Sequence, residues 1–261
     1  MISSLVGLNV RRKSNGIPIL KDSEIDSYAE SLLRLYDSAL LSELQEIDIE
    51  DFVENYLKLD LRYLKLSHSG YIWGRMVFAN TKILVYDEAN NATNEEPVEG
   101  NTVVIETRLA EDIKREHALR STVAHEGGHF IFHAQYYLSE HNPNQILIPF
   151  GEPVKCNPFC ASHDILGGDG RKGLITDVDW MEHHAKHFSA AILMPKTTVK
   201  MLCECLHSRY PIWENQNAIT AVSRVFNVSR ESARIRLEYL WKSQKKREIM
   251  AKKSLSICYT A

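Results

Sequence analysis

Three histidines and a glutamate occur at regular spacing in one apolar stretch of the chain, TVAHEGGHFIFH (122–133). On an α-helix, residues four apart lie on one face, one turn above the other, so His125 and His129 can direct ring nitrogens to a single ion. Glu126 then points to an adjacent edge, where its carboxylate can reach a water at that ion. The H-E-x-x-H spacing predicts a metal site with its general base. The alternative is a helix that buries these histidines for packing alone.

A third ligand is needed, because a catalytic zinc usually has three protein ligands and one open position. Glu182 is the best candidate, since it precedes Ala185 and Phe188 in another amphipathic segment and should lie at the edge of the packed face. Rival ligands in the same segment are His183, His184 and His187. His133 continues the four-residue series but lies about 80° from His125 around the helix. We expect a structural role for it, or a contact with a ligand, instead of a bond to the metal.

The elements that must position these residues are helices and a small sheet. Ser23 should cap a helix over 23–45, with Asp26 three residues on, and a short helix should begin at Asp48. Strands are predicted at LRYLKLS (61–67), GYIWGRMVFA (70–79), KILVYD (82–87) and TVVIETRL (102–109). The polar segment 88–101 predicts a loop. A long helix over about 111–138 then carries the histidine motif.

The second half of the chain is predicted to be mainly helical. Residues 142–173 are rich in proline and glycine and predict an irregular excursion near the site. A helix should begin at Thr176 or Asp177 and end at Pro195. Its apolar face should consist of Met181, Ala185, Phe188 and Ile192. The order of helices, antiparallel strands and helices predicts an α+β protein, with one domain at 1–196 and a helical segment at 197–261.

The paired motifs resemble those of the ImmA/IrrE family of zincin-like metallopeptidases. RSTVAHEGGHFIFH (120–133) is similar to that family's R-F-T-L-A-H-E-L-G-H-x-x-x-H, and EHHAKHFSAAILMP (182–195) is similar to its E-x-x-A-N-x-F-A-A-x-L-L-M-P. The resemblance covers about residues 23–241. It implies a zincin-like core with a small antiparallel sheet and a Zn²⁺ cofactor. It also implies ligand roles for His125, His129 and Glu182 and a general-base role for Glu126.

The sequence departs from the family pattern at two positions. Gly127 replaces the usual leucine, and two mid-helix glycines cost about 1 kcal/mol each against alanine, so packing must hold this helix. Lys186 replaces the usual asparagine and cannot accept a hydrogen bond, so support for a ligand histidine must come from elsewhere. Tyr136 and His163 are candidate donors to the reaction's oxyanion, although packed or surface roles are commoner for such residues.

The cysteines and the apolar runs bear on the compartment. Five cysteines, an odd number in a chain of this length, favour reduced thiols and a cytoplasmic protein. The C-x3-C-x2-H pattern of Cys156, Cys160 and His163 is a weak candidate for a second metal, because structural zinc sites usually have closer cysteines and a fourth ligand. Cys203 and Cys205 indicate packing only. No apolar run is long enough to span a bilayer, so no membrane contact is expected.

The charge is unevenly distributed along the chain. Residues 224–253 carry an excess of +7, whereas the whole chain carries −3, so the remainder carries −10. The segment AITAVSRVFNVSRESARIRLEYL (218–240) reads as helix, turn, helix, with Asn227 in the turn and Ser229 capping the second helix. Arg230, Arg234 and Arg236 on that second helix are similar to a DNA-contacting arrangement. The alternative is a helical hairpin packed on the rest of the protein with a solvated basic face.

Two functional hypotheses follow. The first is a cytoplasmic zinc endopeptidase, for which the family resemblance implies a regulatory protein as substrate, a helix-turn-helix repressor. The second is a non-catalytic, zincin-like regulator that binds DNA or a protein partner through its C-terminal helices, with a helix-turn-helix unit at about 215–241. The intact Glu126 favours the first.

Overall fold

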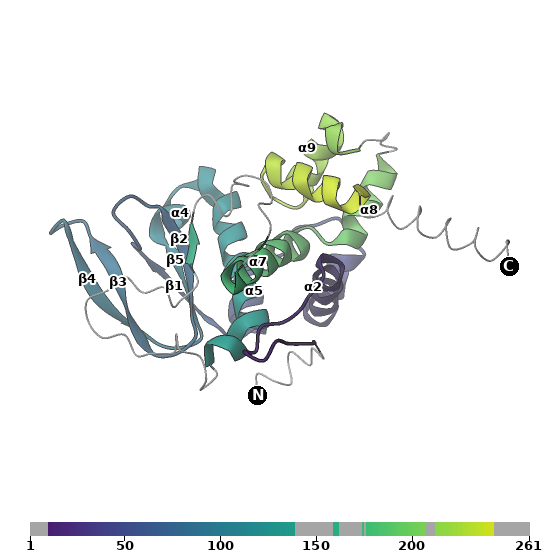
Figure 1. Cartoon of the computed structure of the whole chain (residues 1–261). Coiled ribbons are helices and arrows are strands. Elements are labelled where there is room, and N and C mark those ends of the chain that lie inside the picture. Colours follow the sequence, from purple (N-terminus) through teal and green to yellow (C-terminus); the bar gives the residue numbers. More distant parts are fainter. Residues whose placement is uncertain (1–9, 139–158, 162–173, 175, 207–211, 243–261) are drawn as a thin grey trace.

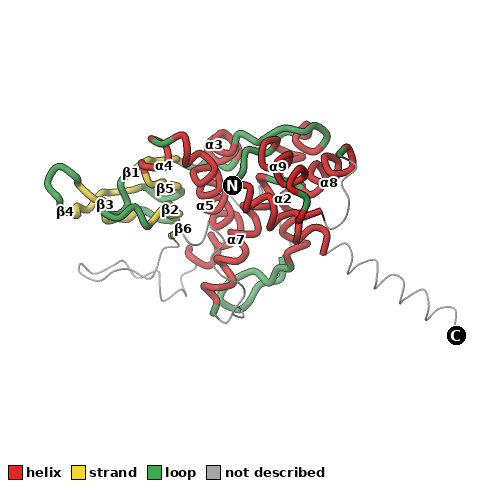
Figure 2. The backbone as a smooth tube through the Cα atoms, turned by 90° about the horizontal axis from the view of Figure 1, so that it is seen from above, coloured by secondary structure: helices red, strands yellow, loops and turns green. Residues whose placement is uncertain are grey.

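The computed structural model describes residues 10–138, 159–161, 174, 176–206 and 212–242. Strands gather on one side of the molecule and helices on the other, with α5 between them (Figures 1 and 2). The α+β class predicted from the sequence is therefore confirmed. Within the described part of the chain, no helix has the length and apolar character that crossing a bilayer requires.

The elements follow one another along the chain in a helix–sheet–helix order. The helical elements are α2 (Asp22–Tyr36), η1 (Ser38–Leu41), α3 (Ile49–Asp51), η2 (Phe52–Tyr56), α4 (Thr107–Glu111), η3 (Ile113–Arg115), α5 (Glu116–Leu138), α7 (Asp177–Leu193), α8 (Lys196–Cys205), η5 (Ile212–Glu214), α9 (Gln216–Val225) and a last helix at 230–242. The strands are β1 (Asp60–Leu64), β2 (Ile72–Val77), β3 (Thr81–Asp87), β4 (Ala92–Val98), β5 (Thr102–Glu106) and β6 (Phe159–Ala161).

The main sheet has the strand order β1-β5-β2-β6. β2 pairs antiparallel with both β5 and β6, but β1 runs parallel to β5, with Asp60 opposite Thr102. The expectation of a wholly antiparallel sheet is therefore wrong at this pair. The reason is that β5 inserts between β1 and β2, so two strands that are close in sequence do not pair with each other.

The segment 88–101 is not the loop that its polar composition predicts. It contains β4, which forms a two-stranded hairpin with β3 around Asn91, whose φ of 48° suits the turn. Most of β4 is exposed or only half-buried, so its sequence lacks the apolar alternation of a covered strand. Its one buried residue, Val98, packs with Ile83 and Val104 in a small second core.

The first helix begins and ends differently from the prediction. Lys21, not Ser23, occupies the N-cap position, and Glu24 closes a capping box with the Lys21 backbone. The helix ends at Tyr36 because Asp37 adopts an extended conformation and its carboxylate accepts a hydrogen bond from the Ala39 backbone, which starts a 3-10 turn. Asp26 lies near the start of α2, as predicted, but its side chain is buried in the molecular core and takes no part in the cap.

Other predicted elements agree with the structure. Asp48 caps the short helix α3 through its carboxylate, and Thr176 caps α7 in a capping box with Asp179. The predicted apolar face of α7 is fully buried. The motif helix starts at Glu116 instead of 111, because Asp112 caps a separate 3-10 turn before it.

The C-terminal unit is a helix, a turn and a helix, as the sequence predicts. Asn227 has the positive φ of 49° that the turn requires, and the Ser229 hydroxyl accepts a hydrogen bond from the Ser232 backbone as the cap of the second helix. The predicted solvated basic face is wrong for Arg236, which is 2% exposed and bonded to Asp26 at 2.7 Å. Arg234 is half-exposed and pairs with two glutamates of its own helix.

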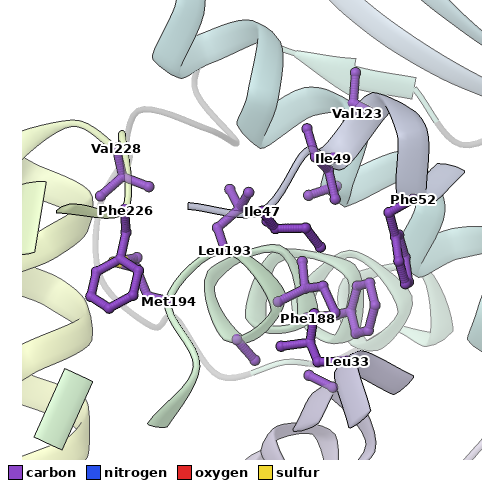
Figure 3. Close-up of a cluster of buried hydrophobic side chains, with 14 of the residues drawn as sticks. Leu33, Ile47, Ile49, Phe52, Val123, Phe188, Leu193, Met194, Phe226 and Val228 are labelled. Carbon is purple, nitrogen blue, oxygen red and sulfur yellow. The ribbon is translucent and has the colours of Figure 1, made fainter. Parts of the chain in front are cut away.

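One apolar core extends through most of the described residues. Figure 3 shows side chains from distant parts of the chain in this core, among them Leu33 of α2, Phe188 of α7 and Phe226 beyond α9. The core therefore crosses residue 196, where the sequence predicts a domain boundary. That boundary stays a prediction.

Candidate metal centre

The helix α5 holds His125, Glu126 and His129 in the interior of the protein, all three with no exposed surface. This helix lies between the sheet and α7, so its residues 120–134 are buried on every face of the helix. Burial of polar side chains costs free energy unless they are bonded or bind an ion. The burial of the whole motif therefore requires partners for its polar side chains.

Glu182 reaches the same point from α7. The capping box at Thr176 fixes the first residue of that helix, which places Glu182 in its second turn. One carboxylate oxygen lies 3.2 Å from His125 Nε2 and the other lies 3.3 Å from His129 Nε2. The Glu182 side chain is 24% exposed, whereas both histidines are fully buried.

The spacing of these donor atoms suits a zinc ion. The two Nε2 atoms are 3.1 Å apart, and each lies 3.2–3.3 Å from a carboxylate oxygen. Ligands bonded at about 2.0–2.1 Å to a tetrahedral zinc lie about 3.3 Å from one another. Among the residues that the structure describes, this is the group of histidine, cysteine and acidic side chains close enough to hold a metal. Two imidazoles and a carboxylate form a donor set typical of catalytic zinc.

The electrostatics of the cluster keep the carboxylate ionised. Burial alone would raise the pKa of Glu182, but its interactions with His129 and His125 outweigh that effect and hold the pKa well below its usual range. An ionised carboxylate is the form that binds a cation.

Glu126 lies against the sheet, and a glycine makes room for it. A Cβ added at Gly74 of β2 would come 3.0 Å from Glu126 Oε1 and 2.5 Å from Thr122 Cγ2. The next residue, Arg75, has its pKa lowered by burial and partly restored by the charge of Glu126. Our sequence analysis missed both residues. The signal was present in the strand itself, where a glycine and an arginine interrupt an apolar run.

The other four histidines named as candidates from the sequence separate into two groups. His133 Nδ1 lies 3.1 Å from His129 Nδ1, and His133 Nε2 lies 3.5 Å from His184 Nδ1. The other two rival ligands turn away toward α2, where His183 contacts Asp22 at 2.8 Å and His187 contacts Asp26 at 3.2 Å. None of these four belongs to the group that could share an ion.

Several sequence candidates lie away from the cluster or outside the described residues. Tyr136 follows His129 by seven residues, an axial rise of about 10 Å, and its ring contacts Tyr137. His163 and Cys156 lie outside the described residues, so neither the second oxyanion donor nor the second metal site is tested. Cys160 is described only as a backbone position of β6, opposite Gly74.

Of the two cysteines predicted to pack, Cys203 is buried, but the prediction is wrong for Cys205. Burial raises the pKa of the Cys203 thiol to about 12, and Cys205 is exposed. Lys186 is exposed. A Cβ at Gly127 would meet Val53 and Leu57 at ordinary distances of 3.5 and 3.6 Å, so this glycine is not required for space.

Comparisons with known proteins add no relative. No protein-family model matches the chain, and no curated protein matches it.

Proposed function

We propose that this chain is a zinc-dependent endopeptidase. The observation that carries the proposal is the convergence of His125 and His129 with Glu182, from a second helix, at tetrahedral ligand spacing. The resemblance of both motifs to the ImmA/IrrE zincin-like metallopeptidases supports the same assignment. These three residues would hold the ion and leave its fourth position for water or substrate.

Bound zinc would supply Lewis-acid polarisation of the scissile carbonyl and of water. Glu126 would accept a proton from the attacking water as oxygen bonds to the carbonyl carbon. It would then return that proton to the amide nitrogen as the C–N bond breaks. Its burial against Gly74 supports this role, because a carboxylate held in one place by packing is already oriented for proton transfer.

The substrate and the compartment follow from the family resemblance. We propose a regulatory protein, a helix-turn-helix repressor, as the substrate and the cytoplasm as the place of action. Cleavage of such a protein would relieve repression.

The alternative is a non-catalytic regulator that binds DNA or a partner through the C-terminal helices. Two of the described arginines on its second helix do not favour it. Arg236 is buried in an ion pair, and Arg234 is neutralised by Glu231 and Glu238 on the same helix. Phosphate binding relies on basic side chains that are available to the nucleic acid.

The test combines metal content with two variants. Purified wild-type protein should contain about one zinc per chain, Glu126→Gln should retain it, and Glu182→Gln should lose most of it. Protein N-termini should then be compared between cells that express the wild type and cells that express Glu126→Gln. A cleavage product that depends on the intact glutamate is expected. Wild-type protein without zinc, or equal biological activity of Glu126→Gln, would overturn the proposal.

A further inference from the structure

Three buried imidazoles form a continuous series that begins at a ligand and ends on another helix. His129, His133 and His184 are each at most 1% exposed. His129 Nδ1 lies 3.1 Å from His133 Nδ1, and His133 Nε2 lies 3.5 Å from His184 Nδ1. The rings of His133 and His184 are stacked, with centroids 5.7 Å apart and planes inclined by 16°. The first two rings belong to α5, and the third belongs to α7.

Proton counting fixes the tautomer of every ring in this series. A neutral imidazole has one N–H and one acceptor nitrogen. If His129 offers Nε2 to the ion, its proton is on Nδ1 and is donated to His133 Nδ1. His133 must then hold its own proton on Nε2, which points to His184 Nδ1. His184 in turn carries its proton on Nε2.

The series requires a neutral His133. A charged His133 would present an N–H to His129 Nδ1 and remove the acceptor that the ligand needs.

We propose that His133 and His184 are positioning residues that together fix the tautomer and the ring orientation of His129. The inference rests on the proposed zinc site. The helix α7 would then have two roles. It supplies the ligand Glu182 and also His184, which supports the ligand His129 through His133. The positioning role also accounts for the exposed Lys186, since the acceptor for His129 comes from α5 itself.

The test is zinc affinity, measured by competition with a chelator, in paired variants. His133→Leu removes the acceptor, whereas His133→Asn keeps an amide oxygen near the Nδ1 position. Loss of such a partner typically weakens metal binding about 10–100-fold. We expect a loss in that range for His133→Leu, recovery of most of it in His133→Asn, and a loss of about tenfold or less for His184→Leu. The unfolding of each variant is also measured without zinc. This measurement distinguishes a loss of folding stability from a loss of zinc affinity.

His183→Asn is the matched control, because His183 lies beside Glu182 on α7 but directs its ring to Asp22. It should leave the zinc affinity unchanged. Nitrogen-15 shifts of the zinc-loaded wild type give an independent readout: His133 and His184 should both be protonated on Nε2.

The outcomes separate this inference from the proposed function. Wild type that binds no zinc would overturn both. If the wild type binds zinc and both His133→Leu and His184→Leu bind it with the same affinity as the wild type, the positioning role alone would be overturned. A proton on Nδ1 of His133 would overturn it as well.

Discussion

Gly128 of α5 lies directly against Ala185 of α7. A Cβ added at Gly128 would come 3.2 Å from Ala185 Cα and 3.0 Å from Phe188 Cδ1. The contact lies beside His129 on one helix and three residues after Glu182 on the other. This glycine therefore sets how closely the two ligand-bearing helices approach.

Substitution Gly128→Ala should push these helices apart. Overpacking costs about 1–3 kcal/mol, which the helix propensity of alanine offsets by about 1 kcal/mol. We expect unchanged or reduced stability in denaturant unfolding and a zinc affinity reduced by about tenfold or more, since ligand spacing is strict. Gly127→Ala is the control, because its Cβ would make only ordinary contacts; it should keep zinc affinity and gain stability. Equal zinc affinity in the two variants would contradict this account.

Gly74→Ala should damage catalysis and spare the metal. The new Cβ would collide with Thr122 Cγ2 and crowd Glu126 Oε1, and its three nearest atoms belong to these two residues and to none of the ligands. A displacement of about 1 Å in a catalytic group can cost about 100-fold in rate. We expect such a loss in kcat on the cleaved substrate, with zinc content unchanged. Adding Thr122→Ser removes the colliding methyl and should restore part of the rate. A Gly74→Ala enzyme with normal kcat would show that Glu126 does not need this space.

Arg236→Met should destabilise the whole protein. The buried carboxylate of Asp26 would lose its cation, which lies 2.7 Å away, although His187 and Tyr239 would remain in contact with it. Removing one partner of a buried pair costs about 3–5 kcal/mol. Urea unfolding should show this loss, and the double variant Asp26→Asn/Arg236→Met should recover most of it. The half-exposed Arg234→Met should change stability by less than about 1 kcal/mol. A double variant no better than Arg236→Met would argue against the ion pair as the cause.

The lowered pKa of Asp26 predicts how the stability of the protein depends on pH. Burial would raise its pKa, but the hydrogen bond from His187 and the charge of Arg236 outweigh that and hold the pKa well below its usual range. A carboxyl with a depressed folded pKa stabilises the protein fully above its unfolded pKa of about 4. That contribution is lost as pH falls from about 4 toward the folded value. The urea midpoint of the wild type should therefore fall more steeply than that of Asp26→Asn between about pH 5 and pH 3. Parallel curves would show that another group governs the acid transition.

Local patterns in the sequence predicted the residues at the centre of the site. Contacts between segments far apart in the chain could not be predicted in the same way. His125 and His129 converge because a spacing of four is a property of one helix. Glu182 could be predicted as the third ligand because the apolar face of α7 places it at a predictable edge. The contact between His133 and His184, by contrast, depends on how two helices cross, which neither segment encodes alone.

The errors have physical causes of the same kind. β4 has few buried positions and contains Pro97, so nothing in its own sequence distinguishes it from a loop until it pairs with β3. From the sequence, Arg236 is predicted to be a solvated cation, because its partner, Asp26, lies 210 residues earlier. The parallel pairing of β1 with β5 likewise joins residues far apart in the chain, such as Asp60 and Thr102.

The uninterrupted apolar interior that joins Phe188 to Phe226 and Leu237 limits what truncation can reveal. A protein shortened after Pro195 would present to water the surface that now meets these C-terminal side chains, and Asp26 would lose its guanidinium partner. If the truncated protein loses a cellular activity, the loss would then reflect misfolding, whatever the role of the terminal helices. Point substitutions on the outer surface of helix 230–242 are the means of asking whether that region recognises another molecule.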